Sequence, residues 1–493
     1  SRSEAIGIAR TNVERAQGEQ VRARSGRLPQ LTASASYDRA LASEFSSVFG
    51  SDTTGPPCPP FSLQPSAPLN DRVSEIERAI DCGAVGNSFF GGGGDDEVDL
   101  PFGRKNTWRV NLLFSQSVYS GGRLGAQSDI SLAGRDSAEL ALTGARAQLL
   151  FDVTHAFYDA ALSDHLVQIA EATVAQAEAT VRQVQASFEA GAQPEFELLR
   201  ARVTRDNQQP VVIRRRAERD IAILRLKQLL DVPADVDLRL VAPLDGAVPP
   251  APFAERIAAA EQVVAPIDTA RRTAVKEVAA LVRLREASLR AALAERRPSV
   301  SVTSNYSRVA YPSGAFPTGD FRTNWTLGAA VDFPILTGGR QRGSEMIARA
   351  ELEGARLQLQ QIGELAQLDV RSAQAELTAA RAAFDASAGT IEQATRAYQI
   401  AEVRFQAGVS TQLELSDARL LLQQAEANRA QAARDLQVAR ARMALLPDLP
   451  LGASGANASQ RAPAVPAAGG SATQSRIPAS AAPQTNRPGG GNP

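Results

Sequence analysis

Several residue types are scarce in this chain of 493 residues, and the scarcity argues against an enzyme. Histidine and cysteine each occur twice. His155 and His165 are 165 − 155 = 10 residues apart, roughly 15 Å along a helix, so they do not fit the ligand spacing of an ordinary zinc site. The sequence also contains no nucleophile elbow, phosphate-binding loop or Cys/His cluster. We therefore predict no catalytic residues, no cofactor and no metal.

Charge imbalance and long apolar runs are missing as well. The 53 basic residues balance the 54 acidic ones, which argues against a nucleic-acid partner. Lysine occurs only at Lys105, Lys227 and Lys276, and arginine supplies the remaining positive charge. No apolar run approaches the roughly 18 residues of a membrane helix. No signal peptide is visible and the chain starts at Ser1, so we expect a trimmed start.

What the chain does contain is an internal repeat. The stretch FEAGAQPEFELLRARV, Phe188–Val203, returns as FQAGVSTQLELSDARL, Phe405–Leu420, and 405 − 188 = 217. A shared offset at several landmarks indicates a duplication. Two more pairs have this offset, SVYSGGR with PILTGGR and the two tryptophans: Arg123 with Arg340, and Trp108 with Trp325.

Each copy of this stretch predicts the tip of a helical hairpin. A long helical pattern ends at Gly191 or Gly408, where glycine permits the positive φ that terminates a helix. In the first copy Pro194 suits the start of the next helix. In the second copy Ser410 or Thr411 is a candidate N-cap.

Four segments alternate between apolar and polar residues and are predicted as strands. Apolar-out, polar-in strands of about ten residues fit a membrane barrel with a wet lumen. Trp108, Trp325, Tyr37 and Tyr306 are candidates for the aromatic belt at the membrane interface, and packing inside the strand is the alternative for each tryptophan. The predicted apolar faces are Leu31, Ala33, Ala35 and Tyr37; Trp108, Val110, Leu112, Phe114 and Val118; Val300, Val302 and Tyr306; and Trp325, Leu327, Ala329, Val331 and Phe333.

A long loop, residues 40–106, separates the first two strands and is rich in Gly, Pro, Ser and Asp. It includes a short helical candidate at Asp71–Ile80. A Cys58–Cys82 disulfide would close the loop in an oxidising compartment, with two unpaired thiols as the alternative. The acidic run after Gly91 lacks the ligand spacing of a calcium site, so a solvated loop is the favoured interpretation.

Very long helices are predicted between the strands. The first runs from Gly122 to Gly191, which is 191 − 122 = 69 residues or roughly 100 Å, and the second from Gly339 to Gly408. Both carry a sustained 3,4 spacing typical of coiled coils. The two seams are Val167, Ala170, Val174, Ala177, Val181, Val184 and Phe188, and Phe384, Ser387, Ile391, Ala394, Tyr398, Ala401 and Phe405.

Shorter helices form the return path. We predict helices at Glu195–Leu230, with a kink at Pro210, and at Leu413–Leu446. A non-helical segment, Asp231–Pro252, precedes a helical stretch, Phe253–Arg297, whose part from Ile267 onward leads into the third strand. Ser1–Arg27 is its counterpart before the first strand.

The predicted domain organisation follows the duplication. Residues 1–246 form a first structural repeat and residues 247–446 a second, with tips near 191 and 408. Residues 447–493 are rich in Ala, Pro, Gly and Ser, a composition that cannot bury a core, and are predicted as a disordered tail.

This pattern resembles the TolC family of outer-membrane efflux proteins. The resemblance covers Ser1 to Leu446 and rests on the paired F-x-A-G…E-L tips together with S-G-G-R or T-G-G-R before each long helix. It implies a mixed α and β membrane protein, with a duplicated strand pair and long coiled-coil helices. It further implies a homotrimer, in which three chains of four strands would close one 12-stranded β-barrel that a periplasmic α-helical barrel continues.

The resemblance also implies a passive duct in the outer membrane of a Gram-negative bacterium. Its partners would be outer-membrane lipid, a periplasmic adaptor (membrane fusion) protein, and an inner-membrane pump of the RND or ABC type. By analogy with the family, Glu414 and Asp417 would ring the periplasmic aperture and favour cations. The first repeat has Glu197 and Arg200 at the matching positions. The adaptor-docking candidates at the tips are Phe188, Gly191, Leu198, Phe405, Gly408 and Leu415.

One position departs from the family pattern. The family's tethering arginine, two residues past the glycine, is Ser410 here, and Arg404 and Arg419 are the substitutes that the sequence offers.

Small-molecule efflux and type I protein secretion both remain open, because the pump rather than the duct selects cargo. A trimeric coiled-coil adhesin would keep its strands together at one end of the chain, whereas here helices separate two pairs. A soluble coiled-coil scaffold is disfavoured by strands with one apolar face.

Overall fold

The computed structural model covers the whole chain, and it describes residues 3–41, 59–82, 106–241, 244, 255, 268–312, 314–317, 319 and 321–451. The chain divides into two units, Ser1–Leu451 and Gly452–Pro493. The second unit, which holds most of the predicted tail, lies outside the described residues. The first residues assigned to that tail are packed, since Leu449 is 2% exposed.

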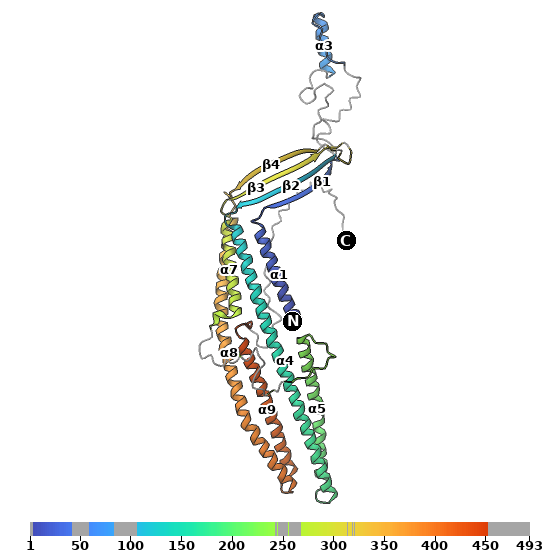
Figure 1. Cartoon of the computed structure of the whole chain (residues 1–493), viewed down its shortest axis with the longest axis vertical. Coiled ribbons are helices and arrows are strands. Elements are labelled where there is room, and N and C mark those ends of the chain that lie inside the picture. Colours follow the sequence, from blue (N-terminus) through green and yellow to red (C-terminus); the bar gives the residue numbers. More distant parts are fainter. Residues whose placement is uncertain are drawn as a thin grey trace, which may run out of the picture. The chain divides into compact units, whose positions relative to one another are not determined.

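The strands form one antiparallel sheet in the order β1-β2-β3-β4 (Figure 1). β1 is Gln30–Arg39, β2 Asn106–Tyr119, β3 Ser299–Ala310 and β4 Phe321–Asp332. The register brings the predicted apolar faces together, because directly opposed residues share a face. Leu31 lies opposite Phe114, Leu112 opposite Tyr306, and Tyr306 opposite Trp325.

A β-bulge interrupts the end of β2. Ser117 pairs with Ser301 but Tyr119 pairs with Val300, so Val118 is the extra residue. A bulge inserts one residue and shifts the alternation that follows it. Tyr119, opposite Val300, therefore joins the apolar face after the bulge.

The two long helices have equal lengths. α4 is Arg123–Glu189 and α8 is Arg340–Gln406, each of 67 residues. Each begins after a left-handed glycine, Gly122 with φ 96° or Gly339 with φ 87°, as the G-G-R motifs predict. Neither helix contains proline.

Five shorter helices complete the described part of the chain. α1 is Glu4–Ser25, α3 Leu69–Asp81, α5 Glu195–Leu230, α7 Thr273–Ala294 and α9 Gln412–Leu445. All four helix–strand junctions lie at one end of the sheet, because α1 and α7 lead into β1 and β3 while β2 and β4 lead into α4 and α8.

α5 has the predicted bounds and includes Pro210. One predicted helix start changes. α7 begins at Thr273 rather than Ile267, after a single 3-10 turn at Thr269–Arg271, because Arg272 has an extended backbone with ψ 136°. Most of the predicted helical stretch before residue 268, including Pro266, lies outside the described residues.

The extended Arg272 belongs to a buried junction between α7, α8 and the end of α9. Its side chain is 1% exposed and its Nη1 lies 2.7 Å from Asp369 Oδ2. Its Nη2 donates to the carbonyl of Leu449 at 3.3 Å. Arg442 contacts the other oxygen of Asp369 at 2.9 Å. This charge network fixes where the helix can start.

The two long helices differ in how well they are covered. α4 packs against α1, α5, α7 and α9, whereas α8 packs against α7 and α9. The coiled-coil seam of α4 is accordingly buried, with Val167 at 3% and Val184 at 1% exposure. The residues of α8 that match these two, Phe384 and Ala401, are only half-buried. One flank of α8 therefore has no partner in the described part of the chain.

Candidate functional site

The two glycine tips have the same backbone. Gly191 and Gly408 both have φ 72°. Gly191 N–H donates to Phe188 O at 2.9 Å, and Gly408 N–H donates to Phe405 O at 3.0 Å. This is the left-handed helix termination that glycine favours, and it confirms the predicted turns.

The helices that follow the tips begin differently, as the sequence predicts. α5 begins directly after Pro194, whose φ is −75°. α9 is capped by Thr411, whose Oγ1 accepts from the Glu414 N–H at 3.4 Å. Of the two candidate caps, the structure selects Thr411.

Three of the predicted docking residues are buried between the hairpins. Leu198, Phe405 and Leu415 are 6%, 6% and 3% exposed. They share one apolar cluster with Tyr398 and Val184. Since a buried side chain cannot contact a partner directly, these three can contribute to docking only by holding the tip together.

The remaining docking candidates lie at the surface. Phe188 is 37% exposed. A Cβ added at Gly191 or Gly408 would have no described atom within 4 Å. The first tip therefore exposes Phe188 and Phe196, whereas the second tip exposes Val409, since its Phe405 is buried.

The aperture candidates Glu414 and Asp417 lie in the first two turns of α9, and both are exposed. Their spacing of three residues places both carboxylates on one helix face. Glu414 Oε2 is 3.9 Å from Arg404 Nη2, and both side chains are more than half exposed. Such an exposed pair contributes little to stability.

Arg419 links the two hairpins. It is 7% exposed and its Nη2 donates to Thr180 Oγ1 of α4 at 2.9 Å. Its Nε has no hydrogen-bond partner in the described part of the chain. Burial raises the pKa of the neighbouring Tyr398, and the charge of Glu402 adds to this, whereas Arg419 opposes it. Of the two substitutes considered for the missing tether at Ser410, only Arg419 reaches from one hairpin to the other.

His155 belongs to an ion-pair network rather than to a catalytic site. Its Nδ1 lies 3.0 Å from Asp159 Oδ2, and its Nε2 lies 2.8 Å from Arg434 Nη2. Arg434 also contacts Asp159 at 2.6 Å. Burial alone would raise the pKa of Asp159, but the hydrogen bond with His155 and the charge of Arg434 outweigh it and lower the pKa. The described residues include no group of three His, Cys, Asp or Glu side chains that could hold a metal.

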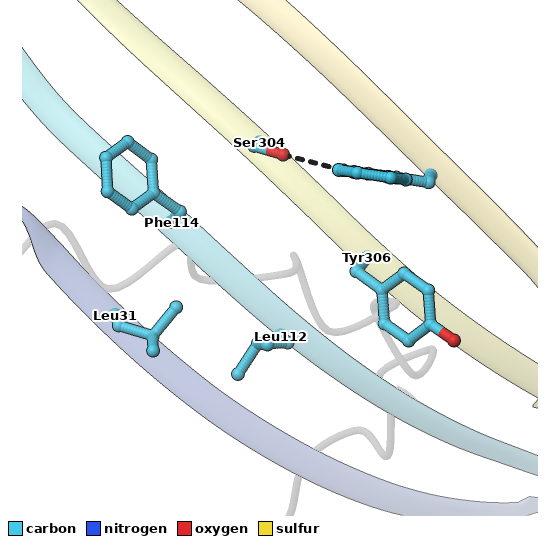
Figure 2. A pocket seen from close by; sticks show the side chains of 6 residues that line it. Leu31, Leu112, Phe114, Ser304 and Tyr306 are labelled. Atoms are coloured by element: carbon cyan, nitrogen blue, oxygen red, sulfur yellow. Dashed lines mark hydrogen bonds between the residues drawn. The ribbon is translucent and has the colours of Figure 1, made fainter.

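The predicted interface aromatics form two pairs on the apolar sheet face. The rings of Tyr37 and Trp108 are 5.0 Å apart, and those of Tyr306 and Trp325 are 6.4 Å apart. Both indole N–H groups donate within the chain at 2.9 Å, from Trp108 to Ala315 O and from Trp325 to Ser304 Oγ. Figure 2 shows the second of these bonds, at Ser304. Each tryptophan thus contacts neighbouring residues of the sheet, and the place of these aromatics in a belt at the membrane interface stays a prediction.

The two tryptophans lie at different levels of the sheet. Trp108 is the third residue of β2 and lies level with Phe321, through Ala310. Trp325 is 325 − 321 = 4 residues further along β4, or about 13 Å. Trp108 is thus level with the first residue of β4, whereas Trp325 is the fifth residue of that strand.

The apolar face of the sheet is open. Figure 2 shows a hollow on it between Leu31, Leu112, Phe114 and Tyr306. Trp325 and Leu327 are 74% and 77% exposed. Such a large apolar surface requires a lipid or protein environment.

The loop between β1 and β2 is described only around α3. Cys82 is disulfide-bonded. Cys58, the only other cysteine of the sequence, lies outside the described residues, as does the acidic run after Gly91.

None of the described helices is both long and apolar enough to cross a membrane. The family model described as "Outer membrane efflux protein" matches residues 92–231 and 268–447. No curated protein sequence matches the chain.

Solved outer-membrane channels share the fold. The Vibrio cholerae protein VceC is 16% identical, with a TM-score of 0.65 over 90% of this chain and 93% of that one. The Campylobacter jejuni channel CmeC is 15% identical, with a TM-score of 0.66 over 92% and 84%. The open state of the Neisseria gonorrhoeae channel MtrE is 18% identical, with a TM-score of 0.63 over 92% and 88%. Because the family model covers more than half of the sequence, the chain belongs to the outer membrane efflux protein family, whose members are non-enzymatic channels of the Gram-negative outer membrane.

Proposed function

We propose that three copies of this chain form the exit duct of a tripartite efflux system. The three four-stranded sheets close one 12-stranded barrel in the outer membrane, and the helices close a periplasmic tunnel. An adaptor protein docks at the tips and an inner-membrane pump of the RND or ABC type supplies the energy. The duct itself conducts passively.

The observation that carries the proposal is the open sheet. β1 and β4 are edge strands, and one face of the sheet exposes Trp325, Leu327 and Val331 at 74%, 77% and 68%. Unpaired strand edges are not tolerated in lipid, so this apolar face requires a closed barrel that four strands cannot make alone.

The helices support the same assembly. The two repeats have equivalent junctions, yet a Cβ at Gly121 would lie 2.6 Å from Arg297 Cβ, whereas one at Gly338 would have no described atom within 4 Å. On α8, Leu357 and Leu368 are exposed at 59% and 64%. A neighbouring copy would cover on α8 what α7 and α9 cover on α4.

Three-fold symmetry would bring three copies of Glu414 and of Asp417 around one axis. A ring of carboxylates concentrates cations and repels anions. Arg419 would hold the hairpin that carries them against α4 through Thr180, in place of the tether that Ser410 cannot supply. Type I protein secretion uses the same architecture and is the second candidate, since cargo is selected by the pump.

The test is block of single channels by a trivalent cation in planar bilayers. The Glu414→Ala/Asp417→Ala double variant should raise the blocking concentration about tenfold, equivalent to about 1.4 kcal/mol. Glu197→Ala, at the matching position of the first repeat, should leave it unchanged. Unaltered block in the double variant would exclude these residues from the aperture, and absence of any conductance would overturn the channel itself.

A further inference from the structure

The helix α3 carries an unpartnered apolar stripe. Leu69, Val73, Ile76 and Ile80 are exposed at 73%, 46%, 40% and 58%. Their spacing is 4, 3 and 4 residues, which is the seam of a coiled coil, with Val73 and Ile80 at a positions and Leu69 and Ile76 at d positions.

This helix is an addition to the duplicated plan. The β1–β2 connection has 106 − 39 − 1 = 66 residues, whereas the β3–β4 connection has 321 − 310 − 1 = 10. The family model begins to match at residue 92, after α3 has ended. The stripe therefore has no counterpart in the second repeat, and it lies outside the residues that the family model matches.

The opposite flank of α3 is already occupied. Glu75 and Arg78 form an ion pair at 2.6 Å. Arg78 Nη2 donates to Pro59 O at 3.3 Å, and Glu75 Oε1 accepts from Ser62 N at 3.4 Å. The disulfide at Cys82 follows the end of the helix. These contacts hold Pro59 and Ser62, which precede α3, against the flank of the helix opposite the apolar stripe. The stripe itself remains exposed.

We propose that, in the trimer proposed above, the α3 helices of three copies pack along this stripe into a short parallel three-helix bundle on the exterior side of the barrel. The inference rests on that proposed assembly. Three-fold symmetry makes the helices parallel. Ile76 at a d position, between Val73 and Ile80 at a positions, suits three strands, whereas Leu69 at the outer d position occurs in two-stranded coils as well.

Charge selects a second copy over a lipid surface. α3 contains four acidic and two basic residues, a net charge of −2, whereas helices that lie on membranes are usually rich in Lys and Arg. In a parallel bundle Arg72 occupies a g position and Glu77 the following e position, since 77 − 72 = 5. Across the described residues neither side chain has an ion-pair partner within its own chain, and Arg72 Nε is buried without a hydrogen-bond partner. Each Arg72 would therefore face the Glu77 of a neighbouring copy.

A seam this short is marginal for an isolated peptide. Attachment to one barrel changes this, because linked segments meet at an effective concentration in the millimolar range. The stretch from Arg39 to Cys58 has 58 − 39 = 19 residues and can span about 60 Å, well beyond a 12-stranded barrel's radius of roughly 12 Å. The three helices can thus meet on the axis, in front of the exit.

The test is cross-linking of the full chain in outer membranes. Ile76→Cys lies in the seam and Ser74→Cys lies outside it, and both are treated with a short bis-maleimide. We expect covalent dimers from Ile76→Cys, up to two of every three chains, at a yield at least fivefold above Ser74→Cys. Adding Arg72→Glu should lower the yield at least twofold, and Arg72→Glu with Glu77→Arg should restore it.

The trimer is measured in the same samples by its mass in native electrophoresis. A trimer that gives no seam cross-link, as expected if α3 lies on lipid or folds back on its own loop, overturns the bundle and leaves the duct intact. Equal yields from the two cysteine positions also overturn it. A chain that is not trimeric overturns the bundle and the proposed assembly together.

Discussion

Two neighbouring arginines show how much position decides what a charge contributes. Arg271 and Arg272 follow each other before α7, yet Arg271 is 83% exposed beside Asp268 and Arg272 is 1% exposed beside Asp369. Arg272 also donates to the carbonyls of Ala366 and Leu449. Removing one partner of a buried ion pair leaves the other charge and its acceptors unsatisfied, whereas an exposed pair is largely replaced by water.

We therefore expect Arg272→Ala to reduce the free energy of unfolding by about 3–5 kcal/mol. Arg271→Ala, the matched control one residue away, should change it by less than about 0.5 kcal/mol. The urea midpoints of the purified variants in detergent, at equal protein concentration, measure the difference. Equal midpoints would show that the junction between α7, α8 and α9 does not depend on this charge.

At the scale of elements, periodicity and glycine positions were sufficient to predict the helices and strands. The 217-residue offset places α8 where α4 predicts it, since 123 + 217 = 340 and 189 + 217 = 406. The features that the sequence missed depend on contacts between distant segments. The late start of α7 follows from the burial of Arg272, and the bulge at Val118 follows from pairing with β3.

The candidate site shows the same division. The glycine tips and the capping residue Thr411 follow from local chemistry. The sequence did not indicate that Leu198 and Leu415 are buried, because burial there depends on two hairpins that lie 217 residues apart in the sequence. It offered Arg404 and Arg419 equally as tethers, and only packing shows that Arg419 reaches α4.

Glycines with positive φ provide a prediction about the junctions. Gly121 has φ 64° and a Cβ there would lie 2.6 Å from Arg297 Cβ and 3.0 Å from Ala294 O. Gly191 has φ 72° with no described atom within 4 Å of an added Cβ. Gly191→Ala should therefore cost only the backbone strain of about 1 kcal/mol. Gly121→Ala should cost a further 1–3 kcal/mol, roughly, from overpacking.

Urea midpoints of the two alanine variants, measured as for the arginines, compare these costs. Because α7 ends against Gly121, hydrogen exchange should also show the extra loss at the ends of α7 and β2 rather than at the tip. A Gly191→Ala variant that is as unstable as Gly121→Ala would mean that backbone strain dominates and that the close approach of Arg297 relaxes without cost.

For the whole molecule, the duplication gives two equivalent halves that a single chain covers unequally. α4 has partners on both flanks, whereas α8 lacks one among the described residues, and the sheet ends in two open edges. Closure with further copies would restore equivalence and would give the sheet one face toward lipid and one toward a lumen. Whether a face of the sheet borders lipid or the lumen decides how much a charged side chain on that face costs.

Leu327 and Thr326 are neighbours in β4 on opposite faces, and both are exposed. An arginine on the lipid face costs about 2–4 kcal/mol near the bilayer midplane, whereas one in a lumen remains hydrated. Leu327→Arg should therefore lower the fraction that folds into lipid vesicles at least tenfold, and Thr326→Arg should leave it nearly unchanged. Protection from protease measures that fraction. The reverse order would place the lumen against the apolar face, which a water-filled duct could not use.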